Sequence, residues 1–428
     1  MKDWNNLTTM RVGFETSNLY PEMAGVYTYS SQLLKHLAQL TDAPTLVLVN
    51  GLGRGSLQEL SAANEGALPA ADYVKARLAL PLMHMANGPW KKDYRTRHIA
   101  YQIDSRTTIP LWRWADTVPM MARLRLPRGV TGHLDVCHWS DYSFLHLPHV
   151  AHVATIHDTI VLRYKEWHPP EDAAHHTRHL YEIARYATRI IVDSENTRQD
   201  TIDLLGISSE RIDVIPLAAS SALRPPTDRR AQQEVLARYG LRNGDYIFYV
   251  GTIEPRKNLV RLATAFKIAV ERSPELTTRL VLAGRRGWLT GPIDAGLQAL
   301  GLGDRLLMPG RVPFEDLPAL LHGARAVGYV SLYEGFGLPP LEAMACGTPV
   351  VASYSSSIPE VVGDAGLLVD PYNVHDIATA LHRIMTDDAL RAELAQRGLR
   401  RAQQFSWIKT AELTMETYRR AITARQQH

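Results

Sequence analysis

The sequence has 428 residues, which is too long for one ordinary hydrophobic core, so two domains are expected. Hydrophobic residues make up 45% of the chain and charged residues 21%, and no apolar run approaches the ~20 residues that span a membrane. The composition is that of a soluble globular protein, and the net charge of +3 decides little about its partners. The start of the chain lacks the hydrophobic segment of a secretory signal, and the two cysteines, Cys137 and Cys346, indicate a reducing compartment. We therefore expect a cytoplasmic protein without a disulfide framework or a zinc cluster.

The first 50 residues predict a strand, a loop that contains glycine, a helix and a second strand. The strands fall at Met10–Glu15 and Thr45–Val49, and Tyr29–Leu40 has the apolar periodicity of a helix. Gly25 lies in the loop between the first strand and this helix. A tight turn that needs glycine explains the loop as well as a ligand-binding role does, so both interpretations remain open.

Residues 73–128 are strongly basic, with eleven Lys or Arg against three Asp. Large apolar side chains such as Trp90, Trp112 and Trp114 are interleaved with these charges. Such a surface suits an anionic membrane, which predicts peripheral contact with the inner face of the cytoplasmic membrane. The alternative is a solvated basic face whose aromatic residues lie in the core. Nucleic acid is not an expected partner, because no nucleic-acid-binding motif accompanies the segment.

Polar residues follow the next pair of predicted strands, Asp135–Trp139 and His152–Ile156. The second strand leads directly into His157 and Asp158. Polar groups at the carboxyl end of a strand in an open α/β sheet lie where ligand sites form. We therefore interpret this pair as functional.

Three histidines, His175, His176 and His179, follow on a predicted helix. The i, i+4 spacing of His175 and His179 suits a metal ion, but the sequence offers no evident carboxylate or cysteine partner. We interpret them as residues of a surface helix. The next strand, Arg189–Ser194, ends in a serine that is suited to cap the following helix.

The second half of the chain repeats the alternation of strands and helices after a predicted linker at Leu217–Asp228. Tyr246–Val250 is almost entirely apolar, as expected of a parallel strand that is covered on both faces. Gly251 follows, and Arg256 and Lys257 are expected to open the next helix. Cations at a helix N-terminus favour a diphosphate, with arginine as a planar fork and lysine as a point charge.

The stretch Glu334–Glu342 combines two carboxylates with a glycine loop and two prolines. The run Ala326–Ser331 predicts a buried strand, so Glu334 lies just beyond its carboxyl end. Pro339 and Pro340 suit the first turn of a helix, which is expected over Leu341–Cys346. A strand, a glycine loop and a helix N-terminus form the arrangement at which open α/β sheets bind anions and nucleotides.

The stretch Glu334–Glu342 is similar to the paired-glutamate signature of the retaining glycosyltransferases of family 4, which have the two-domain GT-B fold. Gly347–Ala352 and Ser357–Gly363 extend the similarity, and shorter matches cover the first half of the chain. The resemblance implies transfer of a sugar from a nucleotide-sugar with retention of the anomeric configuration. It further implies two doubly wound, Rossmann-like α/β domains that face a central cleft.

The resemblance assigns roles to individual residues. Arg256 and Lys257 would stabilise the leaving diphosphate, and Glu334 would hold the hydroxyl groups of the transferred sugar. Glu342 would accept hydrogen bonds from the ribose. The implied catalytic residues are His157, Arg256, Lys257 and Glu334. The implied donor-binding residues are Gly251, Arg311, Val312, Phe336, Gly337, Leu338 and Glu342. The implied acceptor-side residues are Gly25 and Asp158.

No metal or other cofactor is expected. Nucleotide-sugar enzymes of the other main fold neutralise the leaving group with a metal ion at an Asp-x-Asp motif, and this sequence contains no such motif. Cationic side chains and a helix N-terminus can supply the same stabilisation.

The resemblance favours the bacterial mannosyltransferases that extend surface polysaccharides, which predicts GDP-mannose as donor and a glycan or lipid-linked saccharide as acceptor. The alternatives are a UDP-sugar-dependent retaining enzyme, an epimerase or hydrolysing relative, and a catalytically silent scaffold with the same fold. A silent scaffold is expected to lose Arg256, Lys257 or one glutamate, and all of them are present.

The predicted domains are an acceptor-binding domain over residues 1–217 and a nucleotide-sugar-binding domain over residues 218–407. A last helix within residues 408–428 is expected to pack back on the first domain.

Overall fold

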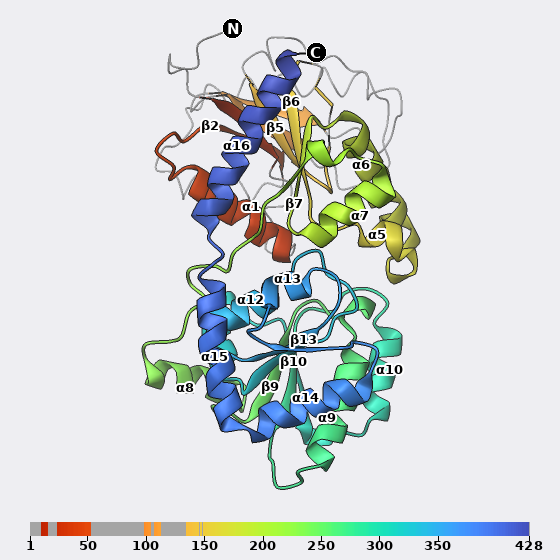
Figure 1. Cartoon of the computed structure of the whole chain (residues 1–428), viewed down its shortest axis with the longest axis vertical. Coiled ribbons are helices and arrows are strands. Elements are labelled where there is room, and N and C mark those ends of the chain that lie inside the picture. Colours follow the sequence, from red (N-terminus) through yellow and green to blue (C-terminus); the bar gives the residue numbers. More distant parts are fainter. Residues whose placement is uncertain are drawn as a thin grey trace.

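The computed structural model describes residues 10–15, 24–52, 98–103, 107–112, 134–144, 146–147 and 149–427. These residues form two α/β lobes, each with its own sheet, which lie one above the other in Figure 1. The side chains of the basic segment 73–128 lie outside the described residues, as do Met1–Thr9 and the loop before Ala24. In the described part of the chain, no helix is long and apolar enough to span a membrane.

The first lobe contains an eight-stranded sheet in the order β4-β3-β2-β1-β5-β6-β7-β8. Its described strands are β1 (Arg11–Glu15), β2 (Thr45–Leu52), β3 (His98–Ile103), β4 (Thr107–Trp112), β5 (Val136–Ser140), β6 (Ala151–Ile156), β7 (Arg189–Val192) and β8 (Ile212–Val214). All neighbouring pairs are parallel except β2–β3 and β3–β4, which are antiparallel. The described helices of this lobe are α1 (Ala24–Leu37), α5 (Ile160–Arg163), η4 (Lys165–Trp167), α6 (Pro170–Tyr186), α7 (Glu195–Leu205) and η5 (Ser209–Arg211).

The second lobe contains a fully parallel sheet in the order β11-β10-β9-β12-β13-β14. Its strands are β9 (Tyr246–Val250), β10 (Arg279–Ala283), β11 (Leu306–Gly310), β12 (Ala326–Tyr329), β13 (Val350–Ser353) and β14 (Leu367–Val369). Its helices are α8 (Arg229–Arg238), η6 (Pro255–Lys257), α9 (Leu259–Glu271), α10 (Gly291–Ala299), η7 (Gly303–Arg305), η8 (Phe314–Asp316), α11 (Leu317–Gly323), α12 (Leu338–Ala345), α13 (Ile358–Val362), α14 (Val374–Thr386) and α15 (Asp388–Ala402).

The apolar character of the central strands explains where the cores lie. Tyr246, Ile247, Phe248 and Tyr249 of β9 are all completely buried, because helices cover both faces of a parallel sheet. The predicted doubly wound α/β architecture is therefore confirmed.

Several predicted boundaries were wrong. Strands β3 and β4 were not predicted at all, although they lie within the basic segment. Helix α1 begins at Ala24 rather than at Tyr29, so Gly25 lies in its first turn and not in a loop. Helix α12 begins at Leu338, three residues earlier than expected, because its two prolines occupy the first turn, where no backbone N–H is needed.

The last helix, α16 (Trp407–Gln426), leaves the second lobe after α15 and packs on α1 and on the sheet of the first lobe (Figure 1). Asp213 of β8 anchors it: the carboxylate accepts from Thr417 and forms ion pairs with Arg420 and, through two bonds of 2.8 Å, with Arg189. The chain thus crosses between the lobes twice, after β8 and before α16. Pro216 and Phe405 from the two crossings line one cavity of about 290 Å³.

Candidate active site

The carboxyl ends of strands from both sheets meet at one place. His157 follows β6 of the first lobe, and the loop Glu334–Gly337 lies between β12 and α12 of the second. A Cβ atom at Gly335 would lie only 1.9 Å from the carbonyl oxygen of His157. The two lobes therefore approach each other here so closely that only glycine fits at position 335, and the candidate site lies where open α/β sheets bind their ligands.

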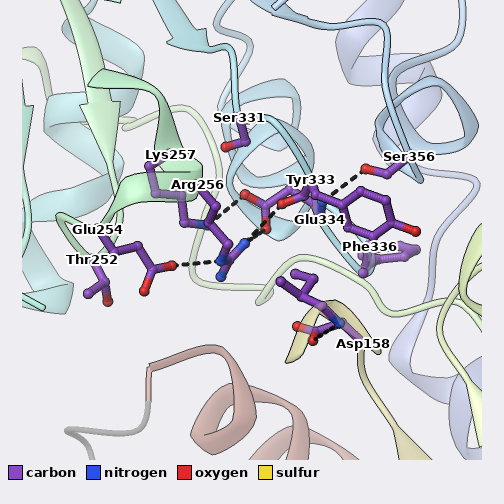
Figure 2. A network of polar contacts seen from close by, with 12 residues as sticks. Asp158, Thr252, Glu254, Arg256, Lys257, Ser331, Tyr333, Glu334, Phe336 and Ser356 are labelled. Carbon is purple, nitrogen blue, oxygen red and sulfur yellow. Dashed lines mark hydrogen bonds and ion pairs between the residues drawn. The ribbon is translucent and has the colours of Figure 1, made fainter. Parts of the chain in front are cut away.

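The carboxylate of Glu334 is the centre of a charged cluster. Lys257 Nζ lies 2.6 Å from Glu334 Oε1, and Arg256 Nη1 lies 2.5 Å from Glu334 Oε2 (Figure 2). The Tyr329 hydroxyl donates to the same Oε1 at 2.9 Å. Burial alone would raise the pKa of Glu334, but the charges of Arg256 and Lys257 outweigh it and hold the pKa at about 2. Glu334 is therefore ionised at any physiological pH.

Arg256 is shared between two carboxylates. Its Nε lies 2.8 Å from Glu254 Oε1, while Nη1 binds Glu334. Both glutamates are buried, so two cations and two anions face each other in a site with little water. The sequence predicted that these two cations open the helix that follows β9. Instead they lie in the short 3-10 turn η6, because Asn258 adopts a left-handed conformation (φ 60°) that separates η6 from α9.

Three consecutive serines fix the backbone of the glutamate loop. Ser356 accepts from the Glu334 N–H at 2.9 Å, and Ser357 donates to the carbonyl oxygens of Glu334 and Phe336 at 2.9 and 2.8 Å. Ser355 donates to the carbonyl oxygens of Ser331 and Leu332. The loop is thus held by side chains of the segment that follows β13, which pre-organises it for a ligand.

Glu342 lies one turn into α12 and is half-buried, with no ion pair in the part of the chain that the structure describes. Burial raises its pKa to about 7. Gly337 is the N-cap of the same helix and has a φ of 114°, a conformation that favours glycine. The two prolines that follow Leu338 have no N–H, and the Leu341 N–H donates to the Gly337 carbonyl oxygen at 3.3 Å, so Leu338 supplies the one unpaired N–H in the first turn of α12 among the described residues.

The remaining predicted donor residues lie along the carboxyl edge of the second sheet. Gly251 directly follows β9, and its carbonyl oxygen would be 1.7 Å from a Cβ atom at Gly284, so two glycines allow neighbouring strand ends to touch. Arg311 and Val312 follow the edge strand β11, which β10 separates from β9. Gly251, Arg256 and Lys257 thus all follow β9, next to β12 and the Glu334 loop, whereas Arg311 and Val312 follow a strand two places away in the sheet.

His157 is held as a cation between carboxylates of the first lobe. Its Nδ1 lies 2.7 Å from Asp193 Oδ2, and its backbone N–H donates to Asp141 at 3.2 Å. Burial would lower the pKa of His157, but the charge and hydrogen bond of Asp193, with Asp141 and Asp158 nearby, raise it to about 9. The buried Nε2 has no hydrogen-bond partner in the described part of the chain. In the protonated ring this N–H is therefore a donor that the described residues leave unused.

The two predicted acceptor-side residues have different surroundings. Asp158 lies beside Gly335 of the other lobe. Its Oδ1 also accepts from the N–H of Ile160, the first residue of α5, at 3.1 Å. Gly25 is exposed, and a Cβ atom there would meet nothing within 4 Å. Packing therefore does not require glycine at position 25.

The interpretation of the histidine triplet as a surface helix was wrong for two of its members. His179 is completely buried, and His176 is buried with its Nε2 3.6 Å from Asp141 Oδ2. No group of three metal-ligating side chains occurs among the described residues. The prediction failed because the buried face of α6 carries histidines with polar partners. A search for periodic apolar residues does not detect such a face.

Sequence reasoning missed several site residues, namely Asp141, Asp193, Glu254, Tyr329, Ser355, Ser356 and Ser357. Asp193 could have been found, because it lies near the carboxyl end of the predicted strand Arg189–Ser194; in the structure it directly follows β7, as His157 follows β6. The serines could not, because their loop meets Glu334 only in the folded chain.

Two stacked Rossmann-like lobes with a buried cluster of cations and carboxylates between their facing strand ends define a GT-B glycosyltransferase. The Anabaena protein Alr3699/HepE, in complex with UDP and glucose, has a similar fold, with a TM-score of 0.65 and 17% identity over 95% of this chain and 99% of that one. The expected GT-B fold is thus confirmed.

The sequence profile of the family Glycosyl transferases group 1 matches residues 232–401. O-antigen chain mannosyltransferase B of Escherichia coli is 37% identical over 290 residues, which cover 66% of this chain and 75% of that protein. The MMP alpha-(1->4)-mannosyltransferase of Mycolicibacterium hassiacum is 29% identical over 77% of this chain and 81% of its own length. The chain belongs to the group 1 glycosyltransferases, and the predicted similarity to bacterial mannosyltransferases is confirmed.

If Lys257 stabilises a leaving diphosphate, replacing it by alanine should lower kcat on the order of 10²-fold or more, because one of two clustered cations is removed. Steady-state kinetics with purified enzyme measures this. Lys409→Ala serves as the matched control, because Lys409 is exposed on α16 and pairs with the exposed Glu412. A Lys257→Ala enzyme with kcat within twofold of the parent would contradict this role.

Replacing Asp193 by asparagine should lower the pKa of His157 well below 9, because the nearest charge that opposes burial is lost. The folded pKa exceeds the unfolded value of 6.5, so the stability that this proton contributes is fully present below about pH 6.5. It is lost as pH rises through about 9. An NMR titration of the His157 ring measures the shift, with Asp203→Asn, an exposed position on α7, as control. A pKa that stays near 9 in Asp193→Asn would refute the assignment.

Proposed function

We propose that the protein transfers mannose from GDP-mannose to a glycan or lipid-linked saccharide in the synthesis of a surface polysaccharide, as a retaining enzyme of family 4. The observation that carries this proposal is the Arg256–Lys257–Glu334 cluster at the junction of the two lobes. The similarity to O-antigen chain mannosyltransferase B supports mannose as the sugar.

The charges of the cluster suggest how a donor enters it. Arg256 and Lys257 are paired with Glu254 and Glu334, so these four side chains together carry no net charge. The diphosphate of a donor competes for both cations, and each cation that turns to phosphate releases part of Glu334. The freed carboxylate then accepts hydrogen bonds from hydroxyl groups of the transferred sugar. Backbone N–H groups around Phe336–Leu338, just before the prolines of α12, add stabilisation to the diphosphate.

Glu342 is the proposed partner of the ribose hydroxyl groups. A carboxyl group with a pKa of about 7 is only partly ionised at neutral pH. Hydroxyl donors stabilise its ionised form, so ribose binding and ionisation of Glu342 favour each other.

His157 acts as a hydrogen-bond donor rather than as a general base. Its pKa of about 9 keeps the ring protonated at neutral pH, so it has no free lone pair to take a proton from the acceptor. The base in this proposal is an oxygen of the leaving phosphate. In the proposed mechanism the acceptor hydroxyl attacks on the face from which the diphosphate departs and gives its proton to a phosphate oxygen.

A UDP-sugar is the alternative donor. The fold neighbour Alr3699/HepE was crystallised with UDP and glucose, and the GT-B fold is common to both proteins. The basic segment 73–128 remains the proposed contact with the inner face of the cytoplasmic membrane, where a lipid-linked acceptor is found.

GDP should stabilise the protein against heat more than UDP or ADP does at equal concentration. A ligand that binds only the folded state adds RT ln(1 + [L]/Kd), about 2.7 kcal/mol at a concentration of 100 Kd. Thermal unfolding with the three diphosphates measures the order, and turnover of GDP-mannose with a saccharide acceptor completes the test. A larger shift with UDP would replace GDP-mannose by a UDP-sugar.

Turnover should not depend on a divalent metal, because Arg256 and Lys257 supply the charge that a metal ion would otherwise supply. Activity is measured after treatment with EDTA and after addition of Mg²⁺ or Mn²⁺. Activity that EDTA abolishes and either ion restores would show that the side chains alone are insufficient.

A further inference from the structure

The N-terminus of α7 is completed by a residue of the other lobe. Glu360 of α13 accepts from the Glu195 N–H through Oε2 and from the Asn196 N–H through Oε1, both at 2.8 Å. These are the first two N–H groups of α7, which have no partner within the helix. A carboxylate at a helix N-terminus is also favoured by the helix dipole. Closure of the two lobes therefore supplies α7 with its missing acceptors.

The same turn of α7 forms hydrogen bonds with the loop that carries Glu334. Ser194 and Thr197 donate to the carbonyl oxygen of Gly335 at 2.7 and 3.0 Å. Asn196 Nδ2 donates to the Tyr333 hydroxyl at 2.7 Å. Gly335 is the immediate neighbour of Glu334, so a shift of α7 relative to the second lobe changes the position of the central carboxylate.

The turn is also joined to His157. Asp193, which holds the His157 ring, is adjacent to Ser194, which holds Gly335. Residues Asp193–Thr197 are therefore a short segment that contacts His157, the loop of Glu334 and Glu360 at once.

The surroundings of Glu360 suit a contact that forms and breaks. Its side chain is exposed, so releasing it leaves no buried charge without a partner. Its backbone is fixed, because Arg401 donates to the carbonyl oxygens of Glu360 and Val361. Glu360 also lines the cavity next to the two chain crossings, which places it beside the segments about which the lobes would turn.

We propose that Glu360 is a positioning residue: by capping α7 across the junction it locks the lobes in the arrangement that sets Glu334 against His157. In the described part of the chain, the hydrogen bonds of its carboxylate are with α7 and not with Arg256 or Lys257. The effect on kcat rests on the proposed glycosyl transfer, whereas the effect on the arrangement of the lobes does not.

Glu360→Ala should lower kcat on the order of tenfold, because two hydrogen bonds to a charged acceptor are lost in the closed state only. The Kd for GDP, measured by calorimetry, should stay within twofold of the parent value. The kcat of Glu360→Gln, which keeps one acceptor oxygen, should lie between those of the parent and of Glu360→Ala. Asp364→Ala is the matched control, because Asp364 is an exposed acid just beyond α13 that lies 3.6 Å from Arg397 and not near α7.

Small-angle X-ray scattering with GDP gives a readout that needs no turnover. The parent and Asp364→Ala should share one radius of gyration, and Glu360→Ala should have a larger one. An unchanged kcat together with an unchanged radius of gyration in Glu360→Ala would overturn the proposal. A loss of GDP binding that parallels the loss of kcat would also overturn it, because Glu360 would then support the donor site itself.

If the parent enzyme turns over no sugar donor, the proposed function fails. The scattering comparison still decides whether Glu360 closes the lobes. UDP or ADP replaces GDP if it stabilises the parent more.

Discussion

The buried carboxylate of Glu334 is the interaction on which the site depends. An ionised glutamate in this position is tolerated only because Arg256, Lys257 and Tyr329 surround it. The same pairing satisfies two cations, Arg256 and Lys257, inside the protein. The cluster is therefore a structural element of the second lobe, in which two cations and two carboxylates balance in charge.

The backbone around this cluster is restrained from both lobes. Ser356 and Ser357 hold the loop from within the second lobe, whereas Ser194 and Thr197 hold it from the first. Gly335 makes the approach possible, because any Cβ atom would collide with the carbonyl group of His157. Catalytic geometry in this enzyme is thus a property of the junction, and neither sheet alone contains a complete site.

Electrostatics assigns different tasks to the three main titratable groups. Glu334 is held ionised by cations, His157 is held protonated by Asp193, and burial raises the pKa of Glu342 to about 7. A site in which the histidine is already charged cannot use it to remove a proton. In the proposed mechanism the leaving group therefore serves as the base.

The sequence by itself determined the class of fold and the core of the site. Apolar runs such as Tyr246–Val250 must be buried on both faces, and local motifs carry Arg256, Lys257 and Glu334 with their glycines. Only the tertiary structure decided which residues meet across the chain. Asp193 with His157, Ser357 with Glu334 and Glu360 with α7 are joined by folding, and hydrogen bonds between distant segments leave no period in a sequence. The same reason explains the buried histidines of α6, whose polar partners replace the apolar signal by which a core is recognised.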